Sequence, residues 1–85
     1  MEEKFKVNNE ESIKKVLLIE PEYQAILNLY EARTDLGITQ KELSKLSGVR
    51  QSNISRIESG ACSPTIHTLS QLALAMNKRL EIEFK

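Results

Sequence analysis

The sequence is poor in the residues from which catalytic and metal sites are commonly built. Its 85 residues include one cysteine, Cys62, one histidine, His67, and no tryptophan. A single cysteine cannot form an internal disulfide, and one His with one Cys cannot complete a metal site. No Gly-rich phosphate loop and no His-containing nucleophile constellation is present. We therefore expect neither an enzyme nor a metal protein, and no cofactor.

Long apolar runs and a net charge of either sign are also missing. The chain has 12 Lys and Arg against 12 Asp and Glu, and no apolar run is long enough to span a membrane. Met1 is followed by an acidic stretch rather than by a secretory signal, so we expect a cytoplasmic protein. A chain of 85 residues forms one small domain, for which a core alone supports folding only marginally. Help from a partner chain is therefore expected.

The most informative stretch is residues 39–60, which is predicted to form two short helices joined by a tight turn. Thr39, followed three residues later by Glu42, has the form of a capping box, so the first helix is expected to start at Thr39. Leu43 and Leu46 then lie on one face of that helix. We interpret them as its apolar face.

A turn and a second helix are predicted immediately after the first helix in the sequence. Gly48 supplies a position where a positive φ is free, so the chain can turn sharply there, and Val49 is expected to enter the core. A second helix is predicted over residues 51–59, with Ile54 and Ile57 turned inward. The polar residues left outside are Arg50, Gln51, Ser52, Asn53, Ser55 and Arg56.

These outward residues are of the types that read base edges in a major groove. Arg pairs with guanine, Gln or Asn with adenine, and Ser with either, whereas a merely solvated helix would more usually carry Glu, Lys and Ala. The basic residues of the stretch outnumber its acids: Lys41, Lys45, Arg50 and Arg56 stand against Glu42 and Glu58. A local basic patch is the footprint expected of a nucleic-acid reader. We interpret this face as DNA-reading, against the alternative of a polar face without a role.

Two further helices are predicted on either side of this stretch. The sequence Glu20-Pro21-Glu22 indicates a helix start, and that helix is expected to run to about residue 36 and stop at Gly37. Its core-facing stripe is read as Tyr23, Ile26, Leu27 and Tyr30. The last helix is expected over residues 65–76, with Thr65 as its N-cap. Its apolar face is read as Ile66, Leu69, Leu72, Ala73 and Met76.

The two ends of the chain are predicted to be less regular. Residues 1–19 are expected to form an arm with a short strand, a short helix or both, which is either merely solvated or binds a partner. In residues 78–85, apolar and charged side chains alternate, which is the pattern of a strand. A lone strand must find a partner for its backbone. Residues 4–7, a second copy of the chain, or another protein could supply it.

Residues 39–60 resemble the helix-turn-helix of the XRE family, which includes the lambdoid phage repressors and many bacterial antitoxins. The matching residues are Thr39-Gln40, Leu43, Gly48-Val49, Ile54-Ser55-Arg56-Ile57 and Glu58-Ser59-Gly60. The resemblance implies a mainly α fold: a compact four-to-five-helix, lambda-repressor-like helix-turn-helix domain over residues 20–77. The short C-terminal β-strand at 78–85 follows it.

The resemblance also implies how DNA would be bound. In that family the first helix crosses the DNA backbone and the second lies in the major groove. Gln40 would then hydrogen-bond a phosphate, with Lys41 beside it, while Gln51, Ser52 and Arg56 would face bases. The reader would bind a double-stranded operator as a homodimer.

Three further positions bear on the match. Arg33 and Glu58 stand where the family has an ion pair that holds the fold rather than touching DNA. Arg50 departs from the pattern, because that position is often a capping Ser or Thr and Arg is a poor cap. The family's basic residue after Gly60 is also replaced, by Ala61, so that loop should add less charge to the phosphate contacts.

The ends of the domain resemble one subgroup more closely. Pro-Glu-Tyr at 21–23, Ser-Pro-Thr at 63–65 and KRLEIEF at 78–84 are similar to HigA-type antitoxins of bacterial toxin–antitoxin systems. That resemblance implies a small basic toxin as partner, a RelE/HigB-like ribonuclease, and repression of the chain's own operon. It also implies a cytoplasmic protein that is nucleoid-associated when bound to DNA. The alternative is a stand-alone XRE-family transcriptional regulator without a toxin partner.

Overall fold

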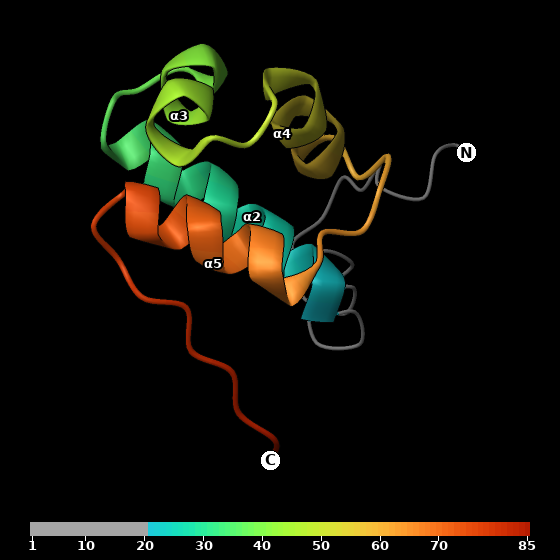
Figure 1. The fold of residues 1–85 in the computed structure, drawn as a ribbon. Coiled ribbons are helices and arrows are strands. Elements are labelled where there is room, and N and C mark those ends of the chain that lie inside the picture. The colour runs from blue at the N-terminus through green and yellow to red at the C-terminus, as the bar shows by residue number, and fades with distance from the viewer. Residues whose placement is uncertain (1–20) are drawn as a thin grey trace.

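The computed structural model describes residues 21–85, which form four helices. These are α2 (Pro21–Asp35), α3 (Gln40–Ser47), α4 (Gln51–Glu58) and α5 (Ile66–Ala75). Helices α2 and α5 run side by side, α3 and α4 cover the same side of this pair, and the C-terminal tail leaves on the other side (Figure 1). The mainly α helix-turn-helix fold predicted from the sequence is confirmed. The arm expected over 1–19 lies outside the described residues.

The helix boundaries follow from the caps that the sequence supplies. The Thr39 side chain accepts a hydrogen bond from the Glu42 backbone N–H, and the Glu42 side chain accepts one from the Thr39 N–H, which completes the predicted capping box. Thr65 caps α5 through the backbone N–H of Thr68. Gly48 ends α3 with a φ of 81°, in the left-handed region. All three were expected from the sequence.

One hydrophobic core joins the four helices. Each helix contributes to it, and Val49 enters it from the turn between α3 and α4, as predicted. The buried residues are Ile26, Leu29, Leu43, Val49, Ile54, Ile57, Leu72 and Met76. Ile54 and Ile57 have no exposed surface, so the inner face of α4 is fixed by packing.

The predicted apolar faces were wrong at three positions. Leu29 is buried where Tyr30 was expected, and Tyr30 is about half exposed, with its ring 5.5 Å from the Arg33 guanidinium carbon. A tyrosine at the edge of the core keeps its hydroxyl in water, so the smaller Leu29 takes the inward place. Leu46, in the last turn of α3, and Ile66, the first residue of α5, are exposed. Both stand at helix ends, beyond the turns that pack.

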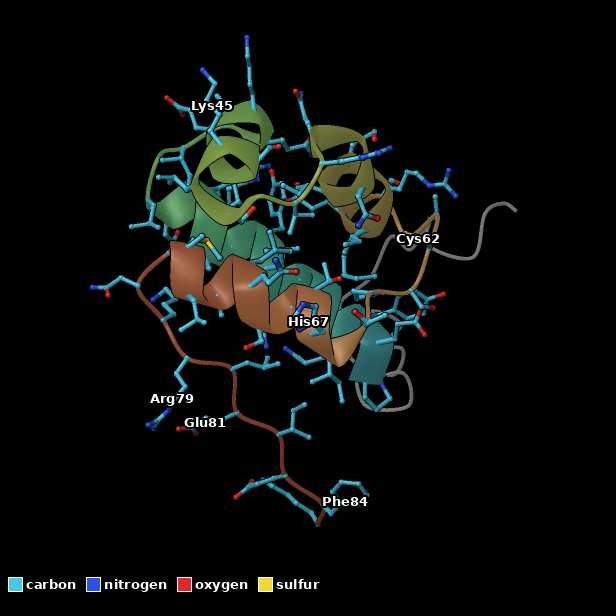
Figure 2. The ribbon with its side chains drawn as sticks, in the orientation of Figure 1. Lys45, Cys62, His67, Arg79, Glu81 and Phe84 are labelled. Atoms are coloured by element: carbon cyan, nitrogen blue, oxygen red, sulfur yellow. The ribbon has the colours of Figure 1, made fainter. Side chains whose placement is uncertain are left out.

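The strand predicted over residues 78–85 is absent. Among residues 21–85 the structure contains no strand, so the tail has no backbone ladder to join. The tail instead continues from α5 away from α3 and α4, and Phe84 near its end is fully exposed (Figure 2). The alternating pattern is present in the sequence, but the single chain offers no second strand in the described part.

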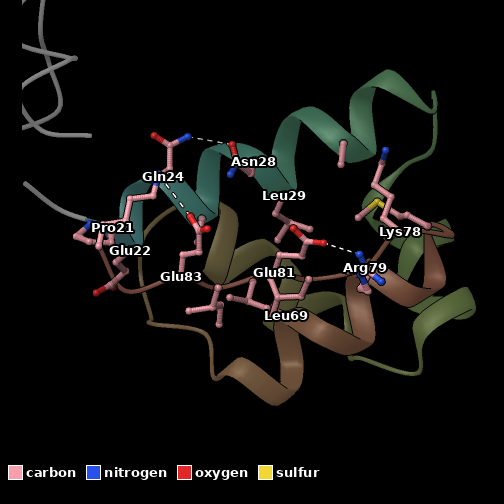
Figure 3. A pocket seen from close by; sticks show the side chains of 17 residues that line it. Pro21, Glu22, Gln24, Asn28, Leu29, Leu69, Lys78, Arg79, Glu81 and Glu83 are labelled. Carbon is pink, nitrogen blue, oxygen red and sulfur yellow. Dashed lines mark hydrogen bonds and ion pairs between the residues drawn. The ribbon is translucent and has the colours of Figure 1, made fainter. Parts of the chain in front are cut away.

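The tail and two helices enclose a groove. Its apolar lining comes from Leu29 of α2, Leu69 and Ala73 of α5, and Leu80 and Ile82 of the tail (Figure 3). Charged side chains, including Arg79 and Glu81, stand at its rim. Of the helices in residues 21–85, none is long and apolar enough to cross a membrane.

Candidate nucleic-acid interface

The outer side of α4 carries the residues that the sequence singled out for base reading. Packing of Ile54 and Ile57 fixes which side of the helix faces out. The exposed residues on that side are Arg50, Gln51, Ser52, Ser55 and Arg56, and Asn53 is half-buried. The helix brings all six candidate residues together along about two turns, with Asn53 turned toward the loop that follows.

Helix α4 begins without help from a side chain. Arg50 occupies the N-cap position and makes no side-chain capping hydrogen bond, as expected for a poor cap. The Arg50 carbonyl accepts the first backbone hydrogen bonds of the helix, from Asn53 and Ile54 at 3.0 Å each. Its guanidinium is therefore not used to start the helix and stays exposed at the start of the outer face.

Two serines that the sequence reading missed fix the turn between α3 and α4. The Ser44 hydroxyl donates to the Val49 carbonyl at 2.6 Å, and the Val49 backbone N–H donates to Ser47 Oγ at 3.1 Å. The Gly48 N–H also bonds back to the Ser44 carbonyl. These bonds hold the two helices at a set angle. The feature of the sequence that could have indicated these hydrogen bonds is a pair of serines in the last turn of a helix that ends at a glycine.

A buried ion pair joins α2 to the end of α4. Arg33 Nε and Nη2 donate to the two carboxylate oxygens of Glu58 at 2.8 and 2.9 Å, and the side chains are only 11% and 5% exposed. Arg33 Nη1 donates to the Ile38 carbonyl at 2.8 Å. The hydrogen bonds that Arg33 donates to Glu58 raise the Arg33 pKa, an effect partly offset by desolvation, so the guanidinium keeps its charge. These are the two residues for which the family pattern implied an ion pair.

Gln40 and Lys41, the two expected backbone-binding residues, differ in their surroundings. Gln40 opens α3, and its Nε2 donates to Glu58 Oε1 at 2.9 Å, so the half-buried amide contacts the ion pair. Lys41 is exposed beside it. The Gln40–Glu58 bond, across 18 positions of sequence, was not expected.

The charges on this side of the molecule are predominantly positive. Lys41, Lys45, Arg50 and Arg56 are all exposed, and Lys45 points away from α5 and the tail in Figure 2. The carboxylate of Glu58 is buried against Arg33, and that of Glu42 accepts the capping hydrogen bond at Thr39. The surface of α3 and α4 therefore offers cations to a polyanion although the whole chain is neutral.

A polar hollow lies beside α4, toward α5. Four of the residues that line it belong to α4 and its N-cap, and three belong to the following loop and α5. They are Arg50, Ser52, Asn53 and Arg56, and Cys62, Thr68 and Gln71. The Cys62 thiol donates a long hydrogen bond of 3.8 Å to Asn53 Oδ1. Thr68 and Gln71 were not singled out from the sequence, since a polar residue on a helix carries no signal of which element it faces.

Comparison with known proteins decides the family. A family model for helix-turn-helix domains matches residues 29–82. The chain belongs to the XRE-type helix-turn-helix family. The match includes the whole of α3, α4 and α5, and it therefore covers the turn, the outer side of α4 and the ion pair described above.

Individual relatives are similar over parts of this helix-turn-helix chain. An uncharacterized HTH-type transcriptional regulator of Haemophilus influenzae is 46% identical over 57 residues, which is 67% of this chain and 58% of that protein. A second such regulator, from Archaeoglobus fulgidus, is 37% identical over 51 residues, 60% of this chain and 73% of the relative. The chain therefore spans little more than half the length of the Haemophilus protein.

A solved structure is similar over almost the whole helix-turn-helix chain. It belongs to a toxin–antitoxin module from Streptococcus pneumoniae, with a TM-score of 0.66 and 28% sequence identity. The alignment covers 93% of this chain and 96% of that chain.

Proposed function

We propose that this protein is a sequence-specific DNA-binding antitoxin. It represses its own operon and neutralises a small basic toxin, a RelE/HigB-like ribonuclease. The single observation that carries the DNA-binding half is the outer side of α4, where Gln51, Ser52 and Arg56 are exposed while Ile54 and Ile57 hold the helix from behind. Its mechanism is equilibrium binding rather than chemistry.

DNA binding follows from the arrangement of α3 and α4. With α4 in the major groove, Gln51, Ser52 and Arg56 face base edges and supply specificity. Gln40 and Lys41 at the start of α3 contact phosphates, which position the domain without reading sequence. Helix-turn-helix readers bind as dimers to half-sites about 34 Å apart, so the operator is a double-stranded, two-fold symmetric site bound by a homodimer.

The antitoxin half is supported by the tail and by the pneumococcal likeness. Within the part of the chain that the structure describes, residues 79–85 make no backbone–backbone hydrogen bond, and the side chains of Ile82 and Phe84 are exposed. Both features favour pairing with another chain. The tail leaves the domain on the side opposite α3 and α4 (Figure 1). A protein bound there would leave α4 free, so one dimer could hold both DNA and a toxin.

Purification of the tagged protein from its native cells, followed by mass spectrometry, tests the antitoxin half. We expect a small basic protein in stable stoichiometric complex, with ribonuclease activity that this chain suppresses. Recovery of only the homodimer and DNA would contradict the antitoxin function. It would favour the second candidate, a stand-alone XRE-family regulator without a toxin, which the names of the Haemophilus and Archaeoglobus relatives support.

Deletion of residues 79–85 tests the tail. We expect weaker dimerisation or weaker partner binding with an unchanged helix content, because the core residues all lie before residue 77. Analytical ultracentrifugation and the pull-down measure the two effects. The matched control replaces Glu81 and Glu83 by Gln, which keeps the backbone and the apolar side chains. A truncated chain that stays dimeric and still holds its partner would show that the tail does neither.

A further inference from the structure

Glu58 accepts three side-chain hydrogen bonds, one more than its ion pair with Arg33 provides. Arg33 already pairs with both carboxylate oxygens, at 2.8 and 2.9 Å, and a bidentate guanidinium is the strongest partner a carboxylate finds in a protein. Gln40 Nε2 adds a third bond, to Oε1, at 2.9 Å. Because Gln40 carries no charge, this bond does not neutralise Glu58. Its effect is to join two helices.

The two helices joined are those that touch DNA in the proposed function. Gln40 is the first residue of α3, and Glu58 is the last residue of α4. The bond therefore links the phosphate-facing end of the first helix to the far end of the reading helix. Helix α4 has no side-chain cap at its own start, so its placement depends on the turn, on the buried isoleucines and on what holds its last residue.

The side chain of Gln40 has groups left for a second partner. An amide nitrogen carries two N–H donors, and within the described part of the chain only one hydrogen bond of the Gln40 side chain is present, the one to Glu58. Pinning by Glu58 restricts where the other N–H can point. A phosphate that accepts from it is thereby connected, through one side chain, to the carboxylate at the end of α4.

We propose that Gln40 is a positioning residue for base reading, which acts on α4 through Glu58 and not only through a phosphate. This inference rests on the proposed DNA-binding function. A residue that merely touches a phosphate weakens binding to all sequences alike. A residue that holds the reading helix in place weakens binding to the right sequence more than to the wrong one.

The test compares two DNA duplexes and two matched substitutions. One duplex is selected by the wild-type protein from a random library, and the other is its scrambled version. Gln40→Met removes both N–H donors at similar length, and Lys41→Met removes an exposed cation one residue away. Fluorescence anisotropy gives the ratio of the two affinities for each protein at one salt concentration.

We expect Gln40→Met to reduce the selected-to-scrambled ratio at least about tenfold, which is within the range of one lost base contact. Lys41→Met should weaken both duplexes by the same factor and lower the salt slope by about 1. An equal loss on both duplexes, or no loss on either, for Gln40→Met would overturn the inference. An equal loss on both duplexes leaves the proposed function intact, whereas no loss on either would also contradict the phosphate contact proposed for Gln40. Sequence-specific DNA binding itself fails separately, if the wild-type protein selects no common sequence.

A second variant tests the same inference if the Gln40→Met protein does not fold. Gln40→Asn retains both N–H donors but is one methylene shorter, which takes the amide out of reach of Glu58. We expect it to lower the selected-to-scrambled ratio, which a loss of phosphate contact from the shorter side chain would not change, because such a loss weakens both duplexes alike. Circular dichroism and the thermal midpoint confirm that each variant is folded. Full discrimination in a folded Gln40→Asn protein would contradict a role through Glu58.

Discussion

Replacement of Arg33 by Met will lower the free energy of unfolding by about 3–5 kcal/mol, the range for removing one partner of a buried ion pair. The Glu58 side chain is only 5% exposed, and the substitution removes the cation that pairs with both of its carboxylate oxygens. Small domains are stable by only about 5–15 kcal/mol in total, so the variant will be partly unfolded near physiological temperature. Urea denaturation followed by circular dichroism measures the change.

The chain contains its own control for this substitution. Arg79 and Glu81 also form an ion pair, but their side chains are 80% and 71% exposed. Arg79→Met should leave the unfolding midpoint close to that of the wild type, because surface pairs contribute little. Arg33→Lys should fall between the two, since Lys keeps the charge but not the two-pronged contact. If Arg33→Met and Arg79→Met unfold alike, the buried pair does not hold the fold.

Replacement of Arg56 or Gln51 by Ala will weaken binding to the selected duplex by about 1–3 kcal/mol each, or roughly 5- to 150-fold. Both side chains are exposed on the outer face of α4 and their removal leaves no cavity. Binding to the scrambled duplex should fall much less, because a base contact carries the sequence information and a phosphate contact does not. Anisotropy on both duplexes, with circular dichroism to confirm folding, measures the effect.

Two substitutions of the same chemical type serve as controls for the reading helix. Gln24 lies exposed on α2 with its amide bonded to Asn28, and Arg79 lies on the tail, away from α4. Gln24→Ala and Arg79→Ala should leave both affinities unchanged. If Arg56→Ala and Gln51→Ala also leave the selected duplex unaffected, then α4 is not the reading helix.

Local features of the sequence determined most of the fold. The capping box at Thr39 and the positive φ at Gly48 involve neighbours a few residues apart, and both were predictable from chemistry alone. The exact rotation of a helix against its neighbours was not. Leu29 and Tyr30 are adjacent and both apolar enough for the core, and only the packed structure decides which one turns inward.

The candidate DNA-binding site also has features that the sequence predicts and features that it does not. Its outward residues could be named because Ile54 and Ile57 define the inward side of α4. The bond between Gln40 and Glu58 could not, because it spans 18 positions and depends on how α3 and α4 meet. The tail forms no strand within the single chain, because a strand is a property of two segments and the alternating pattern specifies only one of them.

The uncapped start of α4 has a consequence for how such proteins diversify. Among the described residues, the buried contacts of the helix come from its inner face, and its last residue is bonded by Arg33 and Gln40, whereas Gln51, Ser52, Ser55 and Arg56 are exposed. Substitutions at Gln51, Ser52 or Ser55 can therefore alter which DNA sequence is recognised with little change in the free energy of unfolding. One scaffold can thus be duplicated within a genome and retuned, so that each copy ignores the operators of the others.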